Sequence, residues 1–99
     1  MKFEYINKNS TMTFYFRGKL NYFSIDSNKI TDLVKGAVCV VFDLEHVDYV
    51  SSDFMTLCML VSKIVGIKQF SVINVNDFSL KVFNICGLKK LLNIYPKAA

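Results

Sequence analysis

Residues 41–54 read VFDLEHVDYVSSDF, and they join the end of an apolar run to the start of an apolar helix. The run begins at Val38 and is continuous to Phe42, which is typical of a central strand in a covered sheet. We expect this strand to close at Asp43 and a polar segment to follow. Residues 54–65 then predict a helix that stops at Gly66. This stretch therefore predicts a strand–helix unit of an α/β fold.

Upstream of this unit, the sequence predicts a hairpin and a helix. Residues 3–5 alternate polar and apolar, residues 7–10 form a turn, and residues 11–20 are rich in β-branched and aromatic side chains. Residues 26–28 resemble a helix start, because Ile30 and the following apolar residues recur at helical spacing. The predicted order to this point is strand, strand, helix.

Downstream, residues 70–75 predict another buried strand, and Asn76 and Asp77 begin a third helix that stops at Gly87. Residues 88–94 predict a last amphipathic turn or short helix before Pro96. Strands that alternate with helices indicate an α/β fold, with helices packed mainly on one face of a mixed sheet of four to five strands.

Length and composition fit one globular domain over residues 1–99. The chain is 53% hydrophobic and 20% charged. Its longest apolar stretch, residues 54–65, is too short and too interrupted to span a bilayer, and the N-terminus lacks the apolar core of a signal peptide. We therefore expect a soluble cytoplasmic protein without membrane insertion. Cys39, Cys58 and Cys86 are widely spaced in apolar runs and are expected to be buried, reduced thiols.

The charge pattern and the polar residues indicate no catalytic or nucleic-acid site. The net charge is +4, but Lys89 and Lys90 are the only adjacent basic pair, so no direct nucleic-acid binding is expected. His46 stands alone in a predicted loop beside Glu45 and Asp48. The glycines are isolated, so no phosphate-binding loop is present. We expect no enzyme activity, no metal and no cofactor.

Three stretches carry a resemblance to a known family. They are residues 41–54, the strand at 70–76 that ends in Asn76, and residues 80–92, which contain the Gly87–Leu88 pair. Gly18 and Leu20 match a further strand ending. In this order and spacing the chain resembles the STAS domain family, of the anti-sigma factor antagonist type. The resemblance covers nearly the whole chain and implies the STAS fold.

The resemblance also implies a function and a phosphoacceptor serine, Ser52. Family members are phosphorylated there by a serine kinase that is also the anti-sigma factor, and a PP2C-type phosphatase reverses the modification. The unphosphorylated form binds the kinase, frees the sigma factor and so regulates transcription. Three positions depart from the family motif: Ser51 replaces an Asp, Asp53 replaces a Ser or Ala, and Phe54 replaces a Gly.

The expected partner-binding residues are Ser51, Ser52, Asp53, Phe54, Met55 and Met59. The helix that they begin is apolar almost all round, so part of it faces the sheet and the rest is either covered or docks a partner. Met55 and Met59 fit either place, whereas Phe54, at the tip, is expected on the partner surface. The alternative for Ser51, Ser52 and Asp53 is a purely structural role as caps of the helix.

A second function uses the same surface. Small stand-alone STAS proteins also serve as subunits of lipid ABC transporters, where they dock on the ATPase. That role needs no phosphorylated serine.

Overall fold

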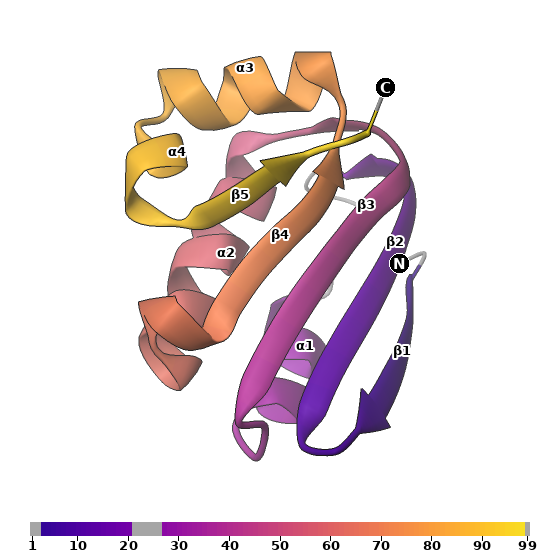
Figure 1. The fold of residues 1–99 in the computed structure, drawn as a ribbon, viewed down its shortest axis with the longest axis vertical. Helices are drawn as coiled ribbons and strands as arrows, with labels where there is room; N and C mark the ends of the chain where they lie inside the picture. The colour runs from indigo at the N-terminus through magenta and orange to yellow at the C-terminus, as the bar shows by residue number, and fades with distance from the viewer. Residues whose placement is uncertain (1–2, 21–26, 99) are drawn as a thin grey trace.

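The computed structural model describes residues 3–20 and 27–98 as one layer of strands with helices against it (Figure 1). The expected helix start at residues 26–28 therefore lies partly outside the described residues. The elements are, in chain order, β1 (Phe3–Lys8), β2 (Thr11–Leu20), α1 (Ser27–Val34), β3 (Cys39–Val50), α2 (Ser52–Val65), the 3-10 helix η2 (Ile67–Gln69), β4 (Phe70–Val75), α3 (Asp77–Ile85), α4 (Leu88–Leu91) and β5 (Asn93–Pro96).

The five strands form one mixed sheet in the spatial order β1-β2-β3-β4-β5. β1 and β2 are an antiparallel hairpin, and each later neighbour pair is parallel. The order advances in one direction, so right-handed crossovers place the connecting helices on the same face. Figure 1 shows α1 and α2 behind the sheet and the near face without a helix across it. The expected α/β fold, with a mixed sheet covered mainly on one face, is confirmed.

The hairpin turn is shorter than expected. The turn consists of Asn9 and Ser10, which have φ of 54° and 64°. A two-residue turn with positive φ at both positions matches the right-handed twist of the flanking strands. β1 consequently runs on to Lys8, which pairs with Thr11.

β3 is much longer than its apolar run. The expectation that it closes at Asp43, with His46 in a loop, is wrong, because pairing with β2 continues to Leu20 and Val50. The register of that pairing shifts twice, between Tyr15 and Arg17 and between Gly18 and Lys19. Each shift changes which side chains of the two strands point to the same face of the sheet. Val47 and Val50 therefore still point into the core, whereas His46 is exposed. The long β3 thus provides hydrogen-bond partners for the backbone N–H and C=O groups along the ten residues of β2.

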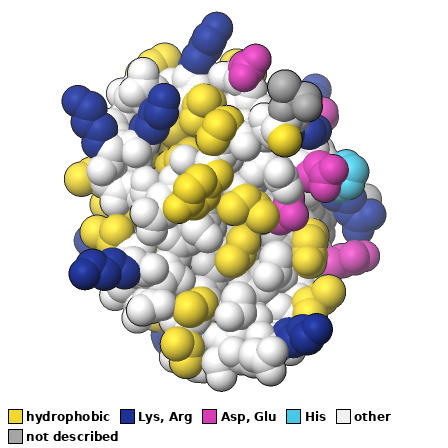
Figure 2. Space-filling model, in the orientation of Figure 1, with side chains coloured by type: hydrophobic (Ala, Val, Ile, Leu, Met, Phe, Trp, Pro, Cys, Tyr) yellow, Lys and Arg dark blue, Asp and Glu magenta, His cyan; other side chains and the backbone are white. Residues whose placement is uncertain are grey.

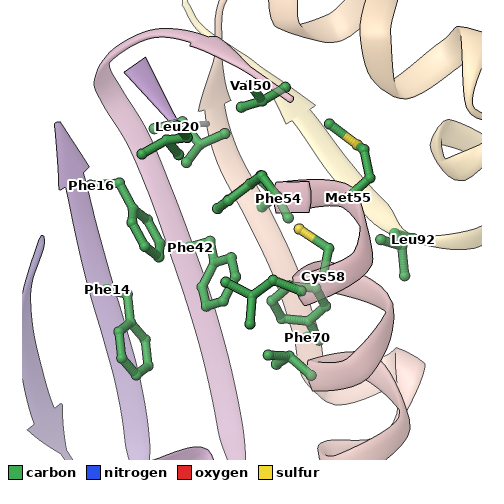
Figure 3. Close-up of a cluster of buried hydrophobic side chains, with 14 of the residues drawn as sticks. Phe14, Phe16, Leu20, Phe42, Val50, Phe54, Met55, Cys58, Phe70 and Leu92 are labelled. Atoms are coloured by element: carbon green, nitrogen blue, oxygen red, sulfur yellow. The ribbon is translucent and has the colours of Figure 1, made fainter. Parts of the chain in front are cut away.

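The core lies between the sheet and the helices and is rich in phenylalanine. The ring of Phe42 lies centrally, with centroids 4.9 Å from those of Phe16 and Phe70 in edge-to-face contacts. Figure 3 shows α2 directing Phe54 and Cys58 at these strand side chains. Among the described residues, the fully buried phenylalanines are Phe14, Phe16, Phe42, Phe54, Phe70 and Phe83.

The C-terminal segment adds a strand to the amphipathic turn that was expected at residues 88–94. α4 covers the first part, and β5 then pairs with β4, with Ile94 opposite Val72. The side-chain amide of Asn93 donates to the carbonyls of Ile67 at 2.9 Å and Phe70 at 3.0 Å, which fixes the start of β5. The edge strand is short because Pro96 cannot donate to the sheet.

Figure 2 shows hydrophobic side chains across the middle of the sheet face that α1 and α2 leave open. Val41 and Ile73 are half-buried there, and Tyr15 is exposed. The pairing of Thr13 with Val41 and of Asp43 with Ile73 places these side chains on neighbouring strands of one face. The sheet thus has one fully packed face and one partly apolar open face.

Candidate functional site

The carboxyl ends of β2 and β3 hold the segment that contains Ser52. The backbone N–H of Ser51 donates to the carbonyl of Leu20 at 3.0 Å, directly after the last β2–β3 pair. α2 begins at the next residue. The parallel strands and the helix start are therefore joined by a single extended residue, which fixes the direction in which Ser52 leaves the sheet.

Ser51 occupies the N-cap position of α2 without capping it. Its φ and ψ are −109° and 174°, and its side chain makes no capping hydrogen bond. The Oγ atom is buried and has no partner among the described residues. The expected side-chain cap is therefore not formed by Ser51, so its hydroxyl does not occupy the N–H groups of the first turn.

Ser52 is the first residue of α2 and its side chain is exposed. Its carbonyl accepts a hydrogen bond from Thr56 Oγ1 at 3.2 Å, one turn further along. Asp53 follows in the first turn and is half-buried. The positive end of the helix dipole favours an anion at this point, whether a carboxylate or a phosphate. The structure thus presents an exposed serine at the positive end of the helix dipole.

Phe54 does not lie on a partner surface, and that expectation is wrong. Its side chain is 0% exposed, with ring centroids 5.3 Å from Phe16 and 5.7 Å from Phe42. The reason is helical geometry, because Phe54 shares its face with Leu57, three residues on, and that face packs on the sheet (Figure 3). An expected tip residue is in fact an anchor of α2 in the core.

The two methionines also face the interior. Met55 is buried, which agrees with the core placement considered for it, and Met59 is half-buried and packs against the core. Burial of Cys58 on the same helix raises the pKa of its thiol well above the ordinary value. Cys86, by contrast, is exposed, so the expectation of a buried thiol is wrong there.

Beyond Ser52, the outward face of α2 carries three residues that were not expected to bind a partner: Thr56, Leu60 and Ile64. Ser52, Thr56, Leu60 and Ile64 recur every four residues, and all four are exposed. Leu60 is 42% and Ile64 39% exposed, so apolar surface lies on the same face of α2 as Ser52, toward the end of the helix. We call these four residues the Ser52 strip. The four-residue spacing from Ser52 was a usable signal, but the helix is so apolar that its two faces are hard to tell apart.

The start of α3 is fixed beside the end of β3. The side-chain amide of Asn76 donates to the carbonyls of Val47 at 3.0 Å and Asp48 at 2.9 Å, and its oxygen accepts from the N–H of Ser79. The ring of Phe78, exposed on α3, meets that of Tyr49 edge-on at 6.3 Å. Asn76 therefore couples the first turn of α3 to the strand that leads to Ser52.

Asp43, within β3, has structural hydrogen-bond partners. Asp43 Oδ1 accepts from the N–H of Glu45 at 3.0 Å and from the amide of Asn74 at 3.1 Å. Within residues 3–20 and 27–98, no three His, Cys, Asp or Glu side chains gather as metal ligands. In the same residues, no helix is long and apolar enough to cross a membrane.

Comparison with known proteins identifies the fold. No protein-family model matches the chain, and no curated protein sequence matches it. Solved structures do: an anti-sigma factor antagonist from Mycobacterium paratuberculosis has a TM-score of 0.82 at 15% identity, over 96% of this chain and 85% of that one. An anti-sigma-factor antagonist (STAS) domain protein from Planctomyces limnophilus has a TM-score of 0.80 at 16% identity, over 99% and 92%.

The chain therefore has the STAS fold, as the sequence resemblance implied. A further neighbour is the Bacillus cell fate determinant SpoIIAA in its phosphorylated form, with a TM-score of 0.66 at 14% identity, over 93% of this chain and 89% of that one. These structural neighbours are anti-sigma factor antagonists, and one of them is described as phosphorylated.

Proposed function

We propose that this chain is an anti-sigma factor antagonist that works by partner switching in the cytoplasm. In the unphosphorylated state, the Ser52 strip binds an anti-sigma factor that is also a serine kinase. Phosphorylation of Ser52 ends that binding, and a PP2C-type phosphatase restores it. The observation that carries the proposal is the exposed Ser52 hydroxyl at the start of α2, in a fold shared with anti-sigma factor antagonists.

The composition of the strip supports a docking surface. Leu60 and Ile64 expose apolar area on the same face as Ser52, although the rest of α2 is committed to the core. Removing such a side chain from water on binding contributes about 1–2 kcal/mol, or a factor of roughly 5–30 in Kd.

The position of Ser52 supports control by a phosphate. A phosphoserine adds a charge of about −1.5 to −2 with three strongly hydrated oxygens. At the end of an apolar strip, that group has to lose water for a partner to dock, which opposes binding. The same phosphate is compatible with the fold, because it lies at a helix N-terminus whose N–H groups Ser51 leaves uncapped.

The departures from the family motif are compatible with the proposal. The bulky Phe54 is turned into the core and so does not cover Ser52. Ser51 has a buried Oγ, which makes Ser52 the accessible hydroxyl of the pair. Asp53 adds a negative charge next to the acceptor. Its half-buried side chain leaves the hydroxyl of Ser52 exposed.

The test is quantitative capture from native cells with the tagged wild type, Ser52→Asp and a matched control, Ser10→Asp. Ser10 is also exposed but lies in the β1–β2 turn, so it controls for an added carboxylate. We expect the wild type and Ser10→Asp to recover an ATP-binding serine kinase, and Ser52→Asp to recover at least tenfold less.

Equal recovery by all three proteins would contradict the switch at Ser52. Recovery of a transporter ATPase in place of a kinase, insensitive to Ser52→Asp, would instead assign the chain to the lipid ABC transporter role. Mass spectrometry of the captured wild type, with and without phosphatase inhibitors, reports whether Ser52 itself carries phosphate.

A further inference from the structure

The corner formed by α3 and α4 exposes aliphatic side chains that the fold does not use. Ile85, at the end of α3, is 83% exposed, and Leu91, at the end of α4, is 54% exposed. Leu88 and Leu92, on either side of Leu91, are buried and hold α4 against the core. Leu91 is therefore kept outward by the packing of its neighbours.

The same corner is basic. Lys81 precedes Ile85 by one helical turn on the exposed face of α3, and Lys89 and Lys90 lie on α4 next to Leu91. Neither Lys89 nor Lys90 forms an ion pair within the part of the chain that the structure describes. Figure 2 shows lysine and arginine side chains near the upper left, where Figure 1 places α3 and α4.

Acidic residues are scarce in this region. Residues 77–98 contain four lysines, and Asp77 is their only acidic residue. Asp77 lies at the opposite end of α3 from Ile85, in its first turn. Both helices therefore contribute lysines close in sequence to Ile85 and Leu91. We call Lys81, Ile85, Lys89, Lys90 and Leu91 the basic corner.

We propose that the basic corner binds the surface of a membrane that contains anionic lipid. Peripheral binding needs two signals, a shallow apolar anchor and a basic cluster, and the corner supplies both. Ile85 and Leu91 reach the boundary of headgroups and acyl chains, and the lysines meet the anionic headgroups. The chain lies on the membrane and does not span it, which is consistent with the absence of a spanning helix in the described residues.

The form of the corner favours a bilayer over an acidic protein as the occupant. The two exposed aliphatic side chains lie on different helices, with Lys89 and Lys90 between them in sequence. A rigid partner needs a matching pocket for each projection, whereas fluid lipid adapts to both. Neutralising headgroup charge contributes about fivefold in partitioning for each lysine.

The test is co-sedimentation of the purified chain with vesicles of 70% phosphatidylcholine and 30% phosphatidylglycerol, and with vesicles of phosphatidylcholine alone. The test variant is Lys89→Glu/Lys90→Glu, and the matched control is Lys8→Glu/Lys35→Glu. Both doubles change the net charge from +4 to 0, but the control lysines lie on β1 and just after α1. Circular dichroism checks that each variant is folded.

We expect the wild type to bind the anionic vesicles and not the neutral ones. Lys89→Glu/Lys90→Glu should reduce partitioning by about 25-fold or more, and the control by less than threefold. Ile85→Ser should weaken the binding, with Ile6→Ser as its exposed control. The proposal is overturned if the wild type binds anionic and neutral vesicles equally, or if both charge doubles lose the same amount, which would indicate only a net-charge effect.

Discussion

Replacing Phe54 by leucine separates a core role from a partner-binding role. The phenylalanine ring is fully buried and, among the described residues, meets the rings of Phe16 at 5.3 Å and Phe42 at 5.7 Å. Each such pair contributes about 0.5–1.5 kcal/mol beyond area burial, so loss of both costs about 1–3 kcal/mol. Leucine keeps most of the apolar volume, and the variant should still fold.

The assay is urea unfolding of Phe54→Leu beside Leu60→Ala. A loss of 1–3 kcal/mol is a large part of the 5–15 kcal/mol by which a domain is stable, and the urea midpoint should fall clearly. Leu60→Ala, on the exposed face of α2, should cost less than about 1 kcal/mol. The reasoning is refuted if Phe54→Leu unfolds within 0.5 kcal/mol of the wild type, because a buried aromatic anchor cannot be replaced at that cost.

Three further predictions follow from the same contacts. Leu60→Ala should weaken capture of the proposed kinase by roughly 5–30-fold without lowering cell levels, and unchanged capture would remove the Ser52 strip from the interface. Asn76→Ala deletes a helix cap and two hydrogen bonds to β3, and should cost about 2–4 kcal/mol in urea unfolding; a loss below 1 kcal/mol would contradict this coupling. Burial raises the pKa of the Cys58 thiol above its ordinary 9.0. The stability that the neutral, buried thiol contributes is therefore present below pH 9 and is lost as the pH rises further. While only the unfolded state ionises, this loss is up to about 1.4 kcal/mol per pH unit. Unfolding measured between pH 8 and 10 should show this slope, and Cys58→Ala should show a smaller one; equal slopes would exclude the thiol as its source.

The fold was predictable from the sequence because its central elements have simple local signals. The run at residues 38–42 and the strand at 70–75 are marked by apolar side chains on both sides, although only one side is fully buried. The helix stop at Gly66 is marked by a positive φ, which favours glycine. Such signals do not depend on the rest of the chain. Their order then restricts the topology, because right-handed crossovers leave few arrangements of the sheet.

The errors occurred where tertiary pairing decides the local structure. The second half of β3 contains Glu45, His46 and Asp48, which read as a loop until β2 supplies hydrogen-bond partners. β5 is only four residues long and exists because β4 offers an open edge. Neither partner is visible in the local sequence.

The site was predictable at Ser52 but not around it. Ser52 was assigned through the family resemblance, and its role as phosphoacceptor stays a prediction. The structure places it as the first residue of α2, two residues before the helix start expected at Phe54. Phe54 was misplaced because the local sequence does not show whether an apolar side chain at a helix start faces the core or the solvent. Only its packing against Phe16 and Phe42 shows that it faces the core. The selection of methionines over Leu60 and Ile64 had the same cause.

The most direct test of the proposed switch compares the affinity of one purified partner for two forms of this chain. The partner is the kinase captured from native cells, and the forms are the unmodified chain and the chain phosphorylated by that kinase with ATP. We predict phosphate on Ser52 and a Kd at least tenfold weaker for the modified form, by calorimetry or fluorescence anisotropy. Phosphate at another residue, or equal affinity of the two forms, would contradict the account.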